Sequence, residues 1–80
     1  KNNTDFNMYL HQGYLIIAAE LSGREMRDFS ALTKKYKMTV TTVKGATAEG
    51  FTYIMQSREE LNQLLREIVR IGIKPNIYTK

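Results

Sequence analysis

The sequence contains no cysteine, which excludes disulfide bonds and thiolate metal sites. It has a single proline and five glycines, and no low-complexity stretch occurs. The longest apolar run, residues 14–19, is far too short to span a bilayer, and no signal peptide is visible, so we expect no membrane insertion by this segment. A cysteine-free chain is typical of the cytoplasm. A first residue other than methionine is consistent with a domain of a larger or membrane-attached protein.

The sequence also lacks the residue sets that carry catalysis or bind metals. His11 is the only histidine, no serine or carboxylate near it in the sequence suggests a triad, and a metal site needs more than one such ligand. The glycines at 45 and 50 have the wrong spacing for a phosphate-binding loop, and no Gly-Lys-Ser/Thr follows. We therefore predict a protein that is not an enzyme and uses no cofactor or metal.

The charge and composition bound the remaining function classes. The net charge is +4, from 12 Lys and Arg against 8 Asp and Glu, which favours anionic partners such as nucleic acid, acidic protein surfaces or anionic lipid. Hydrophobic residues at 42% and charged residues at 25% are ordinary for a globular domain. Eighty residues suffice for one two-layer core. We expect one domain over residues 11–80, preceded by an N-terminal arm or short strand over residues 1–10.

Hydrophobic periodicity predicts two helices among several strands. Alternation over residues 6–10 indicates a short strand or an extended arm, with Phe6 and Met8 on one side and Tyr9 on the other. Two Ser-x-x-Glu capping boxes predict the starts of helices at residues 22 and 57. The first helix is expected to run to about residue 36, and the second to end at Gly72. Further strands are expected at 14–21, 38–43, 51–56 and 73–78, the last at a sheet edge because it contains Pro75.

The two halves of the sequence resemble each other at a shift of 35 residues, which superimposes Ser22 on Ser57 and Met38 on Ile73. A duplicated strand–helix–strand unit predicts an α+β, ferredoxin-like split βαβ sandwich: a four-stranded antiparallel sheet with two helices on one face. The other sheet face is then open, and the strand that begins at Tyr14 is apolar on both sides. Such a face needs a cover. The candidates are the N-terminal arm, a second copy of the domain, or a ligand with flat apolar surfaces such as nucleobases.

Residues 50–56, GFTYIMQ, resemble the third-strand motif of the RNA-recognition-motif family, whose two aromatic side chains stand on the open face and stack on bases. The resemblance implies a stacking platform of Phe51 and Tyr53, to which Tyr14 would add a ring, each base contributing ~1–3 kcal/mol. The lysines expected to meet phosphates are Lys34, Lys35, Lys37, Lys44 and Lys74. The alternative is that Phe51, Tyr53 and Met55 point at the helices as core, and that the lysines at 34–37 complement a helix dipole.

Three functions therefore stay open. The leading hypothesis is binding of single-stranded RNA or DNA on the open sheet face. The alternative is a protein–protein assembly or dimerisation domain that uses the apolar face through Ile16, Ala18 and Ile54. As a third possibility, residues 57–75, SREELNQLLREIVRIGIKP, are similar to the second half of sporulation-related repeat domains. That resemblance implies binding of peptidoglycan glycan strands.

Overall fold

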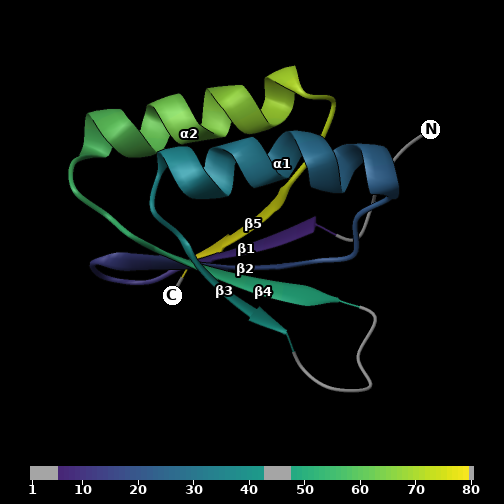
Figure 1. Ribbon diagram of the computed structural model, residues 1–80. Helices are drawn as coiled ribbons and strands as arrows, with labels where there is room; N and C mark the ends of the chain where they lie inside the picture. Colours follow the sequence, from purple (N-terminus) through teal and green to yellow (C-terminus); the bar gives the residue numbers. More distant parts are fainter. Residues whose placement is uncertain (1–5, 43–47, 80) are drawn as a thin grey trace.

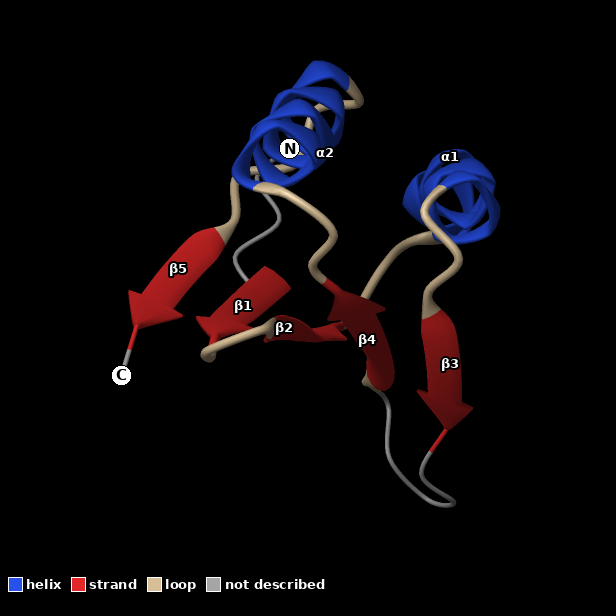
Figure 2. Cartoon of the chain, turned by 90° about the vertical axis from the view of Figure 1, so that its left-hand side faces the viewer, coloured by secondary structure: helices blue, strands red, loops and turns tan. Residues whose placement is uncertain are grey.

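The computed structural model describes residues 6–42 and 48–79 as two helices packed on one side of a five-stranded sheet (Figure 1). The predicted α+β class with both helices on one face is confirmed, and Figure 2 shows the two layers end on. The elements in chain order are β1 (Phe6–Leu10), β2 (Tyr14–Ala19), α1 (Gly23–Lys35), β3 (Thr39–Thr42), β4 (Glu49–Ile54), α2 (Arg58–Arg70) and β5 (Asn76–Thr79).

The sheet has the strand order β3-β4-β2-β1-β5, in which every pair is antiparallel except β1 with β5. The short N-terminal strand expected over residues 6–10 is present as β1, whereas the prediction of a four-stranded, fully antiparallel sheet is wrong, because the sheet has five strands and is mixed. The physical reason is a local hairpin. The His11 N–H donates to the Tyr14 carbonyl at 2.9 Å, and Gly13 takes the positive φ of 92° that the turn requires. This hairpin places β1 directly beside β2, so that β5 pairs with β1 instead of β2.

The observed boundaries of two strands differ from the predicted ones. The predicted strand at 51–56 begins at Glu49 and ends at Ile54, and the one at 73–78 begins only at Asn76. Ile73 is fully buried, and Pro75 interrupts the chain before β5. The predicted edge position of this last strand is confirmed. Residue 43 of the predicted third strand lies outside the described residues.

The two helices begin as their capping residues predict. At α1, the Ser22 Oγ accepts from the Glu25 N–H at 3.3 Å, and the Glu25 Oε1 accepts from the Ser22 N–H at 3.0 Å, a complete capping box. At α2, the Ser57 Oγ accepts from the Glu60 N–H at 3.1 Å, and the return bond is not formed. The Glu60 carboxylate lies instead beside the hydroxyl of Tyr53.

Both helices end in the same backbone motif, at positions related by the shift of 35 residues. The Met38 N–H donates to the Thr33 carbonyl, and the Ile73 N–H donates to the Ile68 carbonyl. The left-handed residue of the motif is Gly72 in the second half, with φ 94°, but Lys37 in the first half, with φ 56°. An L-amino acid therefore occupies a position that favours glycine.

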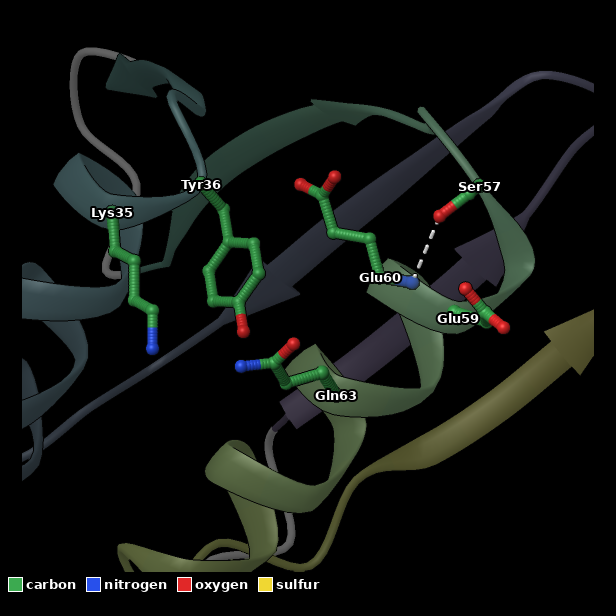
Figure 3. A pocket seen from close by; sticks show the side chains of 6 residues that line it. All are labelled: Lys35, Tyr36, Ser57, Glu59, Glu60 and Gln63. Atoms are coloured by element: carbon green, nitrogen blue, oxygen red, sulfur yellow. Dashed lines mark hydrogen bonds between the residues drawn. The ribbon is translucent and has the colours of Figure 1, made fainter.

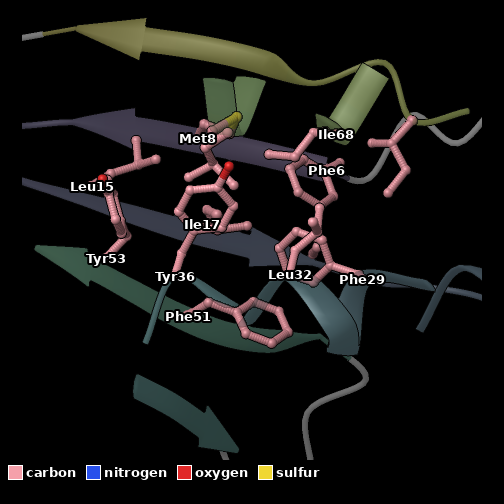
Figure 4. Packing of buried hydrophobic residues seen from close by; sticks show 13 residues of the cluster. Phe6, Met8, Leu15, Ile17, Phe29, Leu32, Tyr36, Phe51, Tyr53 and Ile68 are labelled. Carbon is pink, nitrogen blue, oxygen red and sulfur yellow. The ribbon is translucent and has the colours of Figure 1, made fainter. Parts of the chain in front are cut away.

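The core lies between the sheet and the two helices, and Phe29 of α1 is at its centre (Figure 4). The Phe29 ring packs edge-on against Phe6 of β1, with ring centroids 5.3 Å apart, and against Phe51 of β4 at 4.9 Å. The buried apolar residues are Phe6, Met8, Leu15, Ile17, Ala19, Phe29, Leu32, Tyr36, Phe51, Tyr53, Leu64, Ile68 and Ile73. Every strand except the two edge strands contributes to this set.

Candidate interaction surface on the open sheet face

The strand register divides the sheet residues into two faces. Residues directly opposite each other on neighbouring strands point to the same side, and successive residues along a strand alternate. Leu15 and Ile17 are buried under the helices. Ile16, which lies between them, therefore faces away from the helices, and so do the residues that pair with it on the neighbouring strands. The open face of the described sheet consists of Asn7, Tyr9, Tyr14, Ile16, Ala18, Thr39, Thr41, Gly50, Thr52, Ile54, Asn76 and Tyr78.

One half of this open face is built from tyrosine and asparagine on β1 and β5. The rings of Tyr9 and Tyr78 stack with centroids 5.2 Å apart and an interplanar angle of 18°. Beside them, the Asn76 Nδ2 donates to the Asn7 Oδ1 at 3.2 Å. Both tyrosines are exposed on their outer sides. We call Asn7, Tyr9, Asn76 and Tyr78 the tyrosine half.

The other half is mainly aliphatic and lies on β2 and β4. Ile16 and Ala18 are half-buried in β2, while Ile54 at the end of β4 is 58% exposed. Tyr14 pairs with Ile54, and the ring of His11 stacks on Tyr14 with centroids 4.8 Å apart. The structure thus brings the predicted residues Tyr14, Ile16, Ala18 and Ile54 together on one face. We call Ile16, Ala18 and Ile54, with Tyr14 at the rim, the aliphatic half.

No charged side chain belongs to the open face among the described residues. The lysines predicted to meet phosphates lie elsewhere: Lys34 and Lys35 end α1, Lys37 follows it, and Lys74 precedes β5. Lys44 lies outside the described residues. Lys34 and Lys35 belong to the helix layer (Figure 1), and Lys35 and Lys37 line a cavity together with Ile54 at the end of β4. The structure does not bring these lysines together with the exposed rings.

The predicted stacking platform of Phe51 and Tyr53 is wrong, because both rings face the helices. Phe51 is 2% exposed and Tyr53 is 0% exposed (Figure 4). The register explains this: Phe51 lies opposite Ile17, and Tyr53 lies opposite Leu15, so all four side chains share the core side. The Tyr53 ring packs edge-on against Tyr36 with centroids 6.0 Å apart. The alternative interpretation of these aromatics as core holds.

A second group of polar side chains lies between the helices, where a cavity of about 390 Å³ is lined by residues of both (Figure 3). The Glu67 Oε2 accepts from the Lys35 Nζ at 2.8 Å and from the Tyr36 hydroxyl. These two donors, Lys35 first, hold the pKa of Glu67 below its usual value. Burial and the hydrogen bond to Glu67 raise the pKa of Tyr36 far above its usual value.

The hydroxyl of Tyr53 is buried next to this group and makes no hydrogen bond of normal geometry to any described residue. Burial raises the pKa of Tyr53, and the Glu60 carboxylate raises it further. Glu60 is therefore near the hydroxyl without being in bonding position. The cavity lining contains Glu59 and Glu60 and one lysine, Lys35, whose charge is already paired with Glu67. We assign it a structural role in holding the helices together.

The residues that sequence reasoning missed are those of the tyrosine half. Tyr9 was assigned to the side of its strand opposite Phe6 and Met8, which is where the structure places it. Its partner Tyr78 was not identified, because nothing in the sequence indicates that residues 6–10 and 76–79 pair. The alternation of residues 76–79 is a usable signal only once that pairing is known.

Comparisons with family models, with curated proteins and with solved structures found no match. Among the described residues, no group of three or more histidine, aspartate or glutamate side chains is placed to hold a metal ion. The described helices are also too short or too polar to cross a membrane. The open face is therefore interpreted from its own geometry and chemistry.

Proposed function

We propose that this chain is a non-catalytic assembly domain that dimerises through the open sheet face. The observation that carries the proposal is the composition of that face: tyrosine, isoleucine, threonine and asparagine, with no charged side chain among its described residues. Aromatic residues are enriched and lysine, glutamate and aspartate are depleted at the centres of protein–protein interfaces. The same composition lacks the cations that dominate binding to phosphate backbones.

We interpret the layout as a ferredoxin-like sandwich with one inserted strand, and this insertion enlarges the face that is proposed to dimerise. The units β2-α1-β3 and β4-α2-β5 are two parallel crossovers, and both helices cover the same face. The first crossover passes over β4 alone. The second passes over both β2 and β1, because β1 is inserted between β2 and β5. The insertion widens the open face by one strand and adds Tyr9 to it.

The open face, with its tyrosine half and its aliphatic half, is suited to pack against the same face of a second copy of the chain. In a two-fold symmetric contact the same patch is used twice, so residue A on one copy meets residue B on the other, and the reverse. The tyrosine half of one copy then packs on the aliphatic half of its partner, with Tyr9 and Tyr78 over Ile16 and Ile54. Among the described residues of the open face, this arrangement brings no like charges together, even though the chain carries a net charge of +4.

The area of the open sheet face determines how tightly the proposed dimer is expected to bind. Five strands about 4.8 Å apart, each with about five residues at about 3.3 Å, give roughly 400 Å² of flat face per copy. Two copies therefore bury an area below the roughly 1,600 Å² of a standard interface, in the range of transient contacts. We expect a reversible dimer whose population rises with concentration.

Sedimentation equilibrium from about 5 µM to about 1 mM tests the proposal, a range that brackets binding free energies of about −4 to −7 kcal/mol. We expect monomer at the low end and dimer at the high end. Ile54→Asp, at a side chain that is 58% exposed, should leave a folded monomer at all concentrations. The matched control is Val40→Asp, which adds the same charge at a β-branched residue that is 52% exposed on the helix side of β3, and it should dimerise normally.

The alternative of nucleic-acid binding is decided in the same samples. A fluorescent single-stranded oligonucleotide is titrated with the monomeric chain at low and at high salt. Binding that weakens steeply with salt, in a chain that stays monomeric at about 1 mM, would show that phosphate contacts dominate and would overturn the assembly proposal. Equal loss of dimer in Ile54→Asp and Val40→Asp would overturn it as well.

A further inference from the structure

The edge strand β5 is flanked on the helix side by a basic and apolar surface of α2. All four β5 residues are exposed, and within the described part of the chain no strand pairs with its outer side. Ile77 is 51% exposed, although its register with Met8 places it on the helix side. The helix layer therefore does not extend over the outer edge of β5.

Helix periodicity shows which side of α2 lies toward this edge. Glu67 bonds to Lys35 and Tyr36 of α1, so that flank of α2 faces α1. Residues about half a turn away face in the opposite direction. In Figure 2, α1 lies over the β4 and β3 side of the sheet, and α2 lies toward β5. The flank of α2 that faces away from α1 therefore lies toward the β5 edge.

This outer flank of α2 consists of the exposed residues Arg58, Asn62 and Val69, and Arg66 lies at its solvent-facing border, about 100° around the helix from Glu67. Of the three glutamates of α2, Glu59 and Glu60 line the cavity between the helices and Glu67 bonds to α1. Lys74 adds one more exposed positive charge where the chain enters β5. Arg58, Arg66 and Lys74 supply the positive charge on this side, whereas Arg70 lies near Glu67 and helps to lower its pKa.

The strand itself favours pairing with a further strand. Its sequence, NIYT, is uncharged and rich in residues with high β-propensity. It lacks the lysine or inward-pointing charge with which proteins commonly protect an exposed edge, and its protection is limited to its short length and the proline before it. An extended peptide that joins such an edge gains main-chain hydrogen bonds, and its alternate side chains determine specificity.

We propose that the outer edge of β5 binds an extended acidic peptide of another protein as a sixth strand, under the basic flank of α2. On the helix side, an apolar residue of the peptide packs on Ile77 and Val69, and the acidic residues on either side of it reach Arg66 and Lys74. On the other side, the peptide packs on the exposed edge of Tyr78. This surface shares only Tyr78 with the proposed dimer face, so the proposal goes beyond the dimer proposed above.

A designed peptide tests this proposal without knowledge of the natural partner. The probe is a capped seven-residue peptide with threonine at odd positions, glutamate at the second and sixth, and valine at the fourth. It is titrated to about 1 mM into the isotopically labelled chain, since edge pairing without optimised pockets is expected to be weak. We expect amide shifts and slowed hydrogen exchange at residues 76–79. A peptide with lysines in place of the glutamates should bind at least tenfold more weakly.

Two N-methylated peptides show whether binding is strand addition. One carries methyl groups on the odd amides and the other on the even amides. Because alternate N–H groups of an edge-paired strand point to the neighbouring strand, one peptide should lose binding and the other should retain it. Loss in both or in neither would overturn strand addition. No shift at residues 76–79 with the unmodified probe at about 1 mM would overturn the proposal itself.

Variants separate this site from the proposed dimer face. Ile77→Asp and Arg66→Glu should each weaken the acidic peptide at least fivefold and leave the dimer unchanged. The controls are Ile54→Asp, which should disrupt the dimer and bind the peptide normally, and Lys34→Glu on α1, which makes the same change in net charge as Arg66→Glu. If β5 amides become protected with rising protein concentration and no peptide, a second copy occupies the edge and the peptide proposal is overturned.

Discussion

Two buried tyrosines, Tyr36 and Tyr53, differ in one respect that predicts opposite effects of the same substitution. Their rings pack against each other, but the Tyr36 hydroxyl donates to the Glu67 carboxylate, whereas the Tyr53 hydroxyl is buried without a hydrogen bond of normal geometry. Replacing each by phenylalanine removes one oxygen and leaves the ring packing unchanged. Only the state of the hydroxyl distinguishes the two variants.

The magnitudes follow from what each hydroxyl does. A hydrogen bond to a charged group contributes about 1.5–3 kcal/mol, so Tyr36→Phe should lower the free energy of unfolding by about 1.5 kcal/mol. A buried polar group without a partner costs about 1–3 kcal/mol, so Tyr53→Phe should raise the free energy of unfolding by about 1 kcal/mol. For a domain of this size, about 1 kcal/mol shifts Tm by about 4–8 °C.

The assay is urea denaturation followed by circular dichroism, at protein concentrations where the chain is monomeric. Glu60→Gln in the Tyr53→Phe background shows whether the neighbouring carboxylate contributes. If Tyr53→Phe destabilises the domain as much as Tyr36→Phe does, the Tyr53 hydroxyl is hydrogen-bonded in solution, and the assignment of its burial as a cost is refuted.

Three further predictions concern the same core and its helix ends. Because Lys35 and its neighbours lower the pKa of Glu67 below 4.5, the stability lost in Glu67→Gln should be fully present above about pH 4.5 and should disappear as pH falls through the lowered value, as measured by denaturation from about pH 7 to about pH 3. Lys37→Gly should raise Tm by about 3–6 °C, because relief of the left-handed backbone strain outweighs the entropy that glycine adds to the unfolded chain. Gly72→Ala should lower Tm for the converse reason, and a lower Tm for Lys37→Gly would contradict this explanation. Phe29→Ala should lower the free energy of unfolding by about 3–5 kcal/mol, out of a total of about 4–12 kcal/mol for a domain of this size. A cooperative thermal transition whose Tm lies within a few degrees of that of the unchanged chain would contradict the central position of Phe29.

The elements that depend on nearby residues were predictable from the sequence. Both helix starts follow from a serine whose side chain bonds three residues ahead, and this chemistry is complete within one turn. The buried stripe of α2 follows from the helical spacing of Leu64 and Ile68. These predictions hold because their energetics are local and do not require knowledge of which strands are neighbours.

The orientation of β4 could not be predicted in the same way. Its sequence places aromatic rings at Phe51 and Tyr53 and an isoleucine at position 54, so either side of the strand is apolar enough to be core. The choice is made by the register, which sets Phe51 opposite Ile17 and under Phe29. A one-residue shift would have moved both rings to the open face. A motif of seven residues contains no information about that register.

The inserted strand β1 links the two proposed surfaces to one short turn. The β1–β2 hairpin is local and needs only three connecting residues with a glycine at the left-handed position. By taking the place beside β2, β1 brings Tyr9 opposite Ile16 and next to Tyr78, which forms the tyrosine half of the open face. It also moves β5 outward by one strand, beyond the cover of α2, which leaves Ile77 half exposed on the side that faces the helices. A four-stranded sheet of the predicted kind would have lacked Tyr9 and would have placed β5 one strand nearer the centre of the helix layer. Both the aromatic face and the accessible basic edge therefore depend on the pairing of residues 6–10 with β2.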